Sequence, residues 1–344
     1  MSAVLVRCDG GARIGMGHVS RCLALAGELR GGHGCDVVFA MRDADSAGVA
    51  AVRSSGFLVS PIASREDEDY GPELLSLTSS RAAGALVADV RDTLSRASLE
   101  RVRASGVRVV TIDDGSDRRL GSDLAFYPPV PQVEEMDWSG FTGRRFAGWE
   151  WVLLKREFAS DRGSATAFAL HESHPIDILV TMGGSDPAGM TEFALDALNL
   201  LPLPLAVQVV AGPAFSRAAA LAGIVARSKH AVRVSQGLDA MAPLMRESRL
   251  AVASFGVSAY ELAACGVPAI HLCLTADHAR SSSAFTAARI AESLGIFADV
   301  RPSQLADAVA GLLSDPARVS GMAVRARTLV DGRGAARIAP LVAA

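Results

Sequence analysis

Short apolar segments alternate with longer amphipathic segments along most of this chain. The first group of apolar segments lies at residues 3–8, 36–41, 57–62, 85–90 and 107–113. A second group lies at residues 176–182, 205–212, 231–235, 249–255 and 268–274. Strands that alternate with helices predict a parallel sheet with helices on both faces. We therefore expect an α/β fold with two doubly wound, Rossmann-like domains, one for each group.

The alternation breaks between the two groups. Residues 128–175 hold all three tryptophans and show no clear period. A chain of 344 residues also exceeds the size at which one hydrophobic core usually stops growing. We predict an N-terminal domain over 1–158, a linker over 159–174 and a C-terminal domain over 175–344. Because α/β domains bind ligands at the carboxyl ends of their strands, we expect the two sheets to face a central cleft.

The composition excludes several classes of partner. A net charge of −3 gives no general attraction to nucleic acid or to an anionic membrane. The N-terminal residues do not resemble a signal peptide, and no run of 18 uncharged apolar residues predicts a membrane span. Five cysteines without a CxxC spacing predict neither a disulfide framework nor a zinc site. We expect a cytoplasmic protein.

The first apolar segment is followed by CDGGARIGMGH, a glycine-rich turn that leads into a helical pattern. The spacing invites comparison with the dinucleotide-binding fingerprint, but Ser20 stands at the third glycine position, and Met41 and Arg42 end the second segment where an acidic residue is needed. The chain also has no GxxxxGK[ST] sequence. We therefore interpret Gly15 and Gly17 as parts of a turn that brings backbone N–H groups and a helix N-terminus to an anionic ligand.

The loop GGSDPAG follows the first apolar segment of the second group. Its paired glycines, of which Gly184 is the second, allow a ligand to approach the backbone closely. Ser185 and Asp186 have two interpretations, since their side chains can bind hydroxyl groups or cap the following helix.

The segment SFGVSAYE leads into another helical pattern. Gly256 provides the turn, and Ser258 can cap the helix or contact a phosphate. Glu261 is predicted on the first turn of the helix, where the helix dipole alone explains a carboxylate; binding to the two hydroxyls of a ribose explains it equally.

These residues carry a resemblance to a known family. The motifs RCDG, IGMGHVSRCLALA, GGSDP, SFGVSAYE with GVP, and the segment ADH resemble those of the UDP-sugar hydrolases of pseudaminic acid biosynthesis and of the related spore-coat polysaccharide proteins. The segments VVTIDDGSDR and GWEWVLLKREF also look like segments of that family. Its members are similar in fold to the glycosyltransferases of the GT-B class, so the likeness implies a GT-B-like pair of domains.

The resemblance implies a UDP-sugar substrate, whose nucleotide binds mainly to the C-terminal domain and whose sugar lies near the N-terminal glycine turn. It makes His18 the catalytic residue. An imidazole at a helix N-terminus is disfavoured as a cation, so it keeps a lone pair for use as a general base. The other substrate-binding residues that we expect are Asp9, Gly15, Gly17, Arg91, Asp113, Gly184, Ser185, Gly256, Ser258, Glu261, Asp277 and His278.

The scheme needs no cofactor and no metal ion, because helix N-termini and backbone amides can stabilise a departing diphosphate. The segment DAD at 43–45 resembles the acid pair of metal-dependent glycosyltransferases, but those enzymes have another architecture, and we predict a polar loop there. The acidic segment REDEDY at 65–70 likewise predicts a solvated surface loop.

The chain departs from the hydrolases at the sugar end. Where they carry DHY, this chain has Asp89, Val90 and Arg91, so the expected tyrosine is absent, and Arg91 could bind a carboxylate or phosphate of another sugar or acceptor. Their DNQ is replaced by Asp277 with His278 and an alanine. Our main prediction is hydrolysis of a UDP-sugar by inverting attack of water, with His18 as base. The alternatives are transfer of the sugar to a small-molecule acceptor and noncatalytic binding of a sugar nucleotide.

Overall fold

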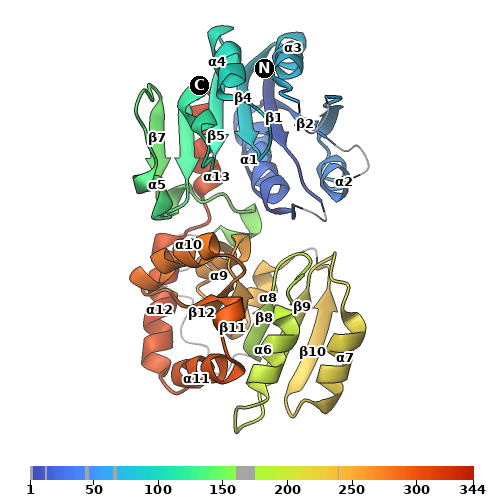
Figure 1. The fold of residues 1–344 in the computed structure, drawn as a ribbon, viewed down its shortest axis with the longest axis vertical. Coiled ribbons are helices and arrows are strands. Elements are labelled where there is room, and N and C mark those ends of the chain that lie inside the picture. Colours follow the sequence, from blue (N-terminus) through green and yellow to red (C-terminus); the bar gives the residue numbers. More distant parts are fainter. Residues whose placement is uncertain (1–2, 12–13, 43–45, 65–67, 160–174, 239) are drawn as a thin grey trace. The chain divides into compact units, whose positions relative to one another are not determined.

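The computed structural model describes residues 3–11, 14–42, 46–64, 68–159, 175–238 and 240–344 (Figure 1). The chain forms two compact units. Unit 1 comprises Met1–Arg156 together with Arg333–Ala344, and unit 2 comprises Glu157–Gly332. The linker predicted over 159–174 lies outside the described residues, apart from Ala159.

Unit 1 is built on a parallel sheet of seven strands in the order β3-β2-β1-β4-β5-β6-β7. The strands are β1 (Ala3–Cys8), β2 (Asp36–Met41), β3 (Leu58–Pro61), β4 (Ala83–Asp89), β5 (Arg108–Ile112), β6 (Leu124–Tyr127) and β7 (Arg144–Ala147). The helices are α1 (Gly17–His33), α2 (Ala47–Ser54), α3 (Gly71–Ser80), α4 (Arg96–Ala104), α5 (Gln132–Glu135) and α13 (Gly334–Ala343). Short 3₁₀ helices lie at Asp117–Gly121, Trp149–Trp151 and Arg156–Phe158.

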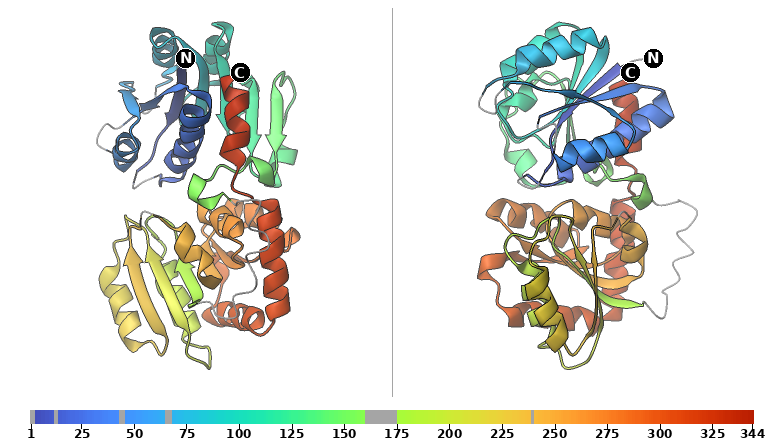
Figure 2. Two further views of the ribbon diagram at one scale, coloured as in Figure 1. Left: turned by 180° about the vertical axis from the view of Figure 1, so that it is seen from behind. Right: turned by 90° about the vertical axis from the view of Figure 1, so that its right-hand side faces the viewer.

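Both faces of this sheet are covered, which explains its nearly continuous apolar strands. Val4 and Val6 of β1 belong to a core that α1, α2 and α13 complete. Leu5 points to the other face, where α3 and α4 pack. Figure 2 shows these helices on the two sides of the twisted sheet.

The C-terminal helix belongs to a different domain from the one predicted for it. We assigned residues 175–344 to one domain, but α13 packs in the core of unit 1. Its buried side chains are Ala335, Ile338, Ala339 and Val342. Their spacing forms one apolar stripe on the helix, and that stripe finds its partners on unit 1.

The segment that we predicted to be irregular is partly a continuation of the first sheet. Within 128–158 the chain forms α5 and the edge strand β7, and an aromatic cluster packs β7 and the 3₁₀ helix at Trp149–Trp151 against β6. In this cluster Phe146 of β7 stacks on Phe126 of β6, with ring centroids 4.7 Å apart, and Trp151 lies against both. The prediction missed β6 and β7 because both strands are only four residues long.

Unit 2 has a parallel sheet of six strands in the order β10-β9-β8-β11-β12-β13. The strands are β8 (Ile176–Thr181), β9 (Ala206–Ala211), β10 (Ala231–Gln236), β11 (Ser248–Ser254), β12 (Ala269–Cys273) and β13 (Ala291–Ile296). The helices are α6 (Met190–Leu198), α7 (Ala218–Arg227), α8 (Ala242–Arg246), α9 (Val257–Cys265), α10 (Ala276–Ala287), α11 (Pro302–Leu313) and α12 (Pro316–Leu329), with a 3₁₀ helix at Phe297–Asp299.

The α/β class with two Rossmann-like units is confirmed, and every predicted strand coincides with an observed strand to within two residues. In each unit the order of the strands reverses once, between β1 and β4 in unit 1 and between β8 and β11 in unit 2. Loops that leave adjacent strands at such a reversal diverge to opposite faces, and this leaves room for a ligand at the carboxyl ends.

Candidate functional site

His18 lies at the reversal point of unit 1, as the second residue of α1. The turn before it is tight: Gly11 and Gly15 exchange two backbone hydrogen bonds of 3.1 and 2.8 Å, and Gly15 has φ +78°. A side chain at Gly10 would collide with Val19, because its Cβ would lie 2.6 Å from Val19 Cγ2. The glycines therefore allow the loop to turn directly into α1, which places His18 at the carboxyl edge of the sheet.

Asp89 is the hydrogen-bond partner of His18. It is the last residue of β4 and is paired in register with Cys8 at the end of β1. The His18 Nδ1 and Asp89 Oδ1 atoms are 2.6 Å apart, and the Asp89 side chain is only 1% exposed. An ionised carboxylate accepts hydrogen bonds, so Nδ1 carries the proton and Nε2 of a neutral ring keeps its lone pair. This is the arrangement of an oriented general base.

Arg21, one helical turn after His18, holds Asp89 in the ionised form. Its Nε lies 2.5 Å from Asp89 Oδ2 and its Nη2 lies 2.6 Å from Oδ1, which makes a two-point contact. Burial alone would raise the pKa of Asp89, but the charge and hydrogen bonds of Arg21, with the bond from His18, hold that pKa well below its usual range. Cys22 adds a weak Sγ–H bond to Asp89 Oδ2 at 3.5 Å.

Asp113 and Arg91 extend this network toward solvent. Arg21 Nη1 donates to Asp113 Oδ2 at 3.0 Å, and Asp113 follows β5 with φ +52°. Arg91, just after β4, approaches the same Asp113 oxygen to 3.8 Å, and its side chain is 68% exposed. The structure therefore brings His18, Arg91 and Asp113, three of the predicted residues, to one edge of unit 1. Their roles toward a substrate stay predictions.

Asp9 is close by but belongs to a second polar cluster. Its Oδ2 accepts from Arg7 at 2.6 Å, and its Oδ1 accepts from the Arg42 backbone N–H at 2.8 Å. These contacts tie together the loops after β1 and β2. The Asp9 side chain is 21% exposed, and its contact with substrate stays a prediction.

The second cluster centres on Asp92, a residue that the sequence analysis did not predict to be part of the site. Asp92 accepts from Arg7 at 2.9 Å, from the Tyr70 hydroxyl at 2.7 Å and from Arg118 at 3.2 Å. Arg118 also donates to the backbone carbonyl of Val90 at 2.8 Å. The cluster therefore anchors the loop that carries Arg91. Tyr70 is 1% exposed, so the solvated loop predicted at 65–70 does not extend to its last residue; residues 65–67 lie outside the described ones.

In unit 2, the loop after β8 lies beside the end of β11. A Cβ built on Gly183, which has φ +78°, would lie 3.6 Å from Ser254 Oγ at the end of β11. Gly212 packs against this loop so closely that a Cβ there would lie 2.3 Å from the carbonyl oxygens of Gly183 and Gly184. Gly184 is exposed and Ser185 is half-buried. The loop thus presents backbone and a small hydroxyl residue at the reversal point.

Asp186 caps the following helix, which is one of the two roles that the sequence suggested for it. Its carboxylate accepts from the backbone N–H groups of Met190 at 2.9 Å and Thr191 at 2.8 Å, at the start of α6. Asp186 is buried and has φ +43°. It shapes the loop and leaves Ser185 as the hydroxyl residue toward solvent.

The helix α9 begins after β11 without a side-chain cap. Gly256 stands at its N-cap position, and Ser258 is the second helical residue and half-buried. Uncapped N–H groups at a helix N-terminus are suited to a phosphate. Glu261 is the fifth residue of α9, so it lies on the second turn and not on the first, where the dipole would favour a carboxylate. This position weakens the explanation by the helix dipole.

The third loop of unit 2 begins α10. Thr275 caps this helix by accepting from the His278 backbone N–H at 3.1 Å. Asp277 is exposed and His278 is half-buried beside the ring of Phe255 at 6.1 Å between centroids. The structure therefore places the predicted residues of unit 2, among them Ser185, Ser258 and Asp277, on the loops and helix starts at the carboxyl edge of one sheet.

Two further described histidines are buried and structural. His271 is fully buried in β12, its Nδ1 lies 2.9 Å from Ser282 Oγ, and burial lowers its pKa to about 3. His230 is held between the backbone of Leu198 and that of Leu205. Among the described residues no group of three His, Cys, Asp or Glu side chains could hold a metal ion. The segment DAD at 43–45 lies outside those residues.

Comparisons with known proteins agree with this architecture. No protein-family model matches the chain. It is 23% identical to the spore coat polysaccharide biosynthesis protein SpsG of Bacillus subtilis, over 97% of this chain and 96% of SpsG. It is 22% identical to the uncharacterized protein MJ1062 of Methanocaldococcus jannaschii over 78% of this chain, and that match spans only 55% of the archaeal protein.

Solved structures are similar over the whole chain. MurG of Acinetobacter baumannii matches with a TM-score of 0.75 at 15% identity and covers 99% of both chains. The chain has the GT-B fold. Anabaena HepE in complex with UDP matches with a TM-score of 0.63 at 12% identity, over 100% of this chain and 98% of HepE. The rhamnosyltransferase SpnG in complex with thymidine diphosphate matches with a TM-score of 0.67 at 16% identity, over 99% of this chain and 100% of SpnG. Among the described residues of this chain no helix is long and apolar enough to span a membrane.

Proposed function

We propose that this protein is a metal-independent glycosyltransferase that moves a sugar from UDP to a small-molecule acceptor, with His18 as the general base. The hydrogen-bonded set of His18, Asp89 and Arg21 carries the proposal. Such a set orients an imidazole and leaves Nε2 free to accept a proton. The GT-B fold and the similarity to the rhamnosyltransferase SpnG favour transfer over hydrolysis.

In the proposed reaction an acceptor oxygen or nitrogen attacks the anomeric carbon from the face opposite UDP. The new bond to the anomeric carbon forms while its bond to the diphosphate oxygen breaks, and the electron pair of that bond leaves with UDP. The acceptor proton moves to His18 Nε2. The Nδ1–H group donates to Asp89 throughout, so the carboxylate stabilises the imidazolium that forms.

We assign the nucleotide to unit 2. The uncapped N-terminus of α9 with Ser258, and the loop of Gly184 and Ser185, offer N–H and hydroxyl donors to a diphosphate. Glu261 is assigned to the ribose hydroxyls. The complexes of HepE with UDP and with UDP-glucose support a nucleotide-sugar ligand for this fold.

We assign the sugar and the acceptor to the edge of unit 1 near His18, with Arg91 and Asp113 as their binding residues. Gly15, Gly17 and Asp9 line the same edge, and Asp277 with His278 are assigned to sugar hydroxyls from unit 2. The exposed guanidinium of Arg91 suits a carboxylate or phosphate on the acceptor.

The decisive experiment measures UDP release from a panel of UDP-sugars, with and without a panel of amines and alcohols. Release that requires an acceptor supports transfer. Release with water alone supports the hydrolysis that the motif IGMGHVSRC favours. No release with any donor, but tight UDP binding, would identify a noncatalytic sugar-nucleotide protein and contradict both reactions.

His18→Ala tests the role of the base. Turnover should fall by about 10²-fold or more while the Kd for UDP stays unchanged, since a general base typically contributes 10²–10⁴-fold. His33→Ala is the matched control, because His33 is the exposed last residue of the same helix. Equal turnover in both variants would contradict the assignment.

A further inference from the structure

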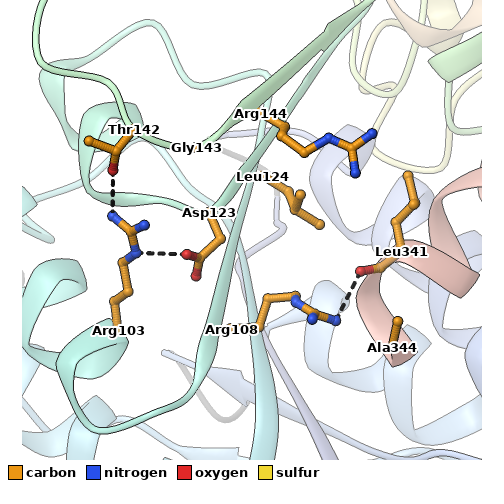
Figure 3. Close-up of a pocket in the computed structure, with 9 residues that line it drawn as sticks. All are labelled: Arg103, Arg108, Asp123, Leu124, Thr142, Gly143, Arg144, Leu341 and Ala344. Atoms are coloured by element: carbon orange, nitrogen blue, oxygen red, sulfur yellow. Dashed lines mark hydrogen bonds and ion pairs between the residues drawn. The ribbon is translucent and has the colours of Figure 1, made fainter.

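A cavity of about 390 Å³ lies at the opposite edge of the unit 1 sheet from His18. Arg108, Leu124 and Arg144 are the first residues of β5, β6 and β7, and the end of α13 closes the cavity (Figure 3). Parallel strands of four or five residues separate this edge from the carboxyl ends by roughly 15 Å. The cavity is therefore distinct from the site of the proposed reaction.

Three arginines line this cavity, and among the described residues Arg103 is the one that forms an ion pair. Its Nε donates to Asp123 at 2.7 Å, and its Nη1 donates to Thr142 at 3.0 Å. Arg108 donates to the carbonyl oxygen of Leu341 at 3.3 Å, and Arg144 lies over the ring of Phe146 at 4.9 Å. Within the described part of the chain, neither Arg108 nor Arg144 has a carboxylate within ion-pair distance. Their side chains extend from β5 and β7, on either side of β6, toward the end of α13 (Figure 3).

Asp123 and Ala344 also line the cavity, but neither Arg108 nor Arg144 forms an ion pair with a described residue. An anion that contacts both guanidinium groups would reduce their mutual repulsion. Each guanidinium has five N–H donors, and only one of those on Arg108 is used in the contact with Leu341. Arginine pairs of this kind suit the tetrahedral oxygens of a phosphate group. Leu124 and Leu341 add apolar surface beside the charges, and this suits an organic substituent on that phosphate.

We infer that this cavity is an accessory anion site that binds a phosphate-bearing ligand between Arg108 and Arg144. The ligand would join the start of β5 and β7 to the end of α13. Binding of this ligand would therefore stabilise the packing of α13 on unit 1. The inference does not rest on the proposed function. The phosphate can belong to a soluble compound or to a lipid headgroup.

Hydrogen–deuterium exchange of the full chain with millimolar pyrophosphate tests this inference. We expect slower exchange of the α13 amides, residues 334–343, because the ligand opposes opening of that helix. In Arg108→Gln/Arg144→Gln the half-saturating concentration should rise at least about tenfold, since the variant removes both charged donor groups of the site. The Kd for UDP should stay unchanged in this variant. Absence of protection in the wild type, or equal protection in the double variant, would overturn the site.

Arg145→Gln is the matched control, because Arg145 is the next residue of β7 and faces Glu134 and Trp138 instead. It should respond to pyrophosphate like the wild type. If the double variant fails to fold, Arg144→Gln alone serves, since that side chain is exposed. Cosedimentation with phosphatidylglycerol vesicles but not phosphatidylcholine vesicles, lost in the double variant, would assign a headgroup. Pyrophosphate binding without cosedimentation would assign a soluble phosphate, and failure of both probes would refute the inference.

Discussion

Replacing Asp89 by asparagine tests the site most directly. The change keeps the shape of the side chain but removes the negative charge of Asp89, which both Arg21 and His18 contact. The new amide can donate a hydrogen bond to His18 Nδ1 across the present 2.6 Å contact. The imidazole proton then moves to Nε2, which loses its lone pair. We expect turnover to fall by about 10²–10⁴-fold, the scale found when an orienting carboxylate is removed from a catalytic histidine.

The same substitution also affects stability, and this effect must be measured separately. Arg21 loses one charge-assisted partner but keeps Asp113 at 3.0 Å and the amide oxygen. The expected loss in the free energy of unfolding is about 1.5–3 kcal/mol, the value of a hydrogen bond to a charged group. A folded variant with low turnover therefore separates the catalytic effect from unfolding.

The assay combines UDP release, UDP binding by calorimetry and thermal unfolding. Asp123→Asn is the control, because Asp123 also pairs with an arginine of unit 1, at 2.7 Å from Arg103, but lies at the other edge of the sheet. It should keep full turnover. If folded Asp89→Asn turns over within about twofold of the wild type, or if Asp123→Asn loses activity equally, the role of Asp89 is refuted.

Three further predictions concern other parts of the molecule. Arg91→Ala should raise KM for an anionic acceptor about tenfold or more and leave a neutral acceptor unaffected, as competition kinetics would show. For His271 the depressed pKa of about 3 means that the unfolded chain binds the proton first. The stability that comes from keeping His271 neutral is fully present above about pH 6.5 and is lost as the pH falls toward 3. Between pH 7 and 5 the free energy of unfolding of the wild type should therefore fall by about 2 kcal/mol more than that of His271→Gln, as measured by urea titration. Ile338→Ala should destabilise unit 1 by about 2–5 kcal/mol, whereas a helix packed on unit 2 would leave the unfolding of unit 1 unchanged.

The regular elements and the loops of the site were predictable because their signals are local. Alternation of apolar and amphipathic segments located the long strands, and a glycine turn before a helix located His18. The short strands β6 and β7 carry too few residues for a period to show. The assignment of α13 failed for a different reason: its apolar stripe was readable, but nothing in the helix says which core it joins.

The partners of His18 were not predictable in the same way. Asp89 was visible at the end of an apolar segment, yet its contact with His18 depends on β4 lying next to β1. The two side chains are 71 residues apart in the sequence, and the strand order brings them together. Arg7, Asp92 and Arg118 are likewise separated in sequence and meet only in the folded unit.

The strand order also explains why the charges of this site must be treated as one set. Arg21 lies between Asp89 and Asp113, so its single positive charge supports two carboxylates at once. A change that removes Asp113 leaves more of the Arg21 charge for Asp89, which weakens the hydrogen bond that Asp89 accepts from His18. An anionic group bound by Arg91 would act on the same Asp113 oxygen. Binding of an anionic acceptor at Arg91 is therefore expected to change how Arg21 holds Asp89, the hydrogen-bond partner of His18.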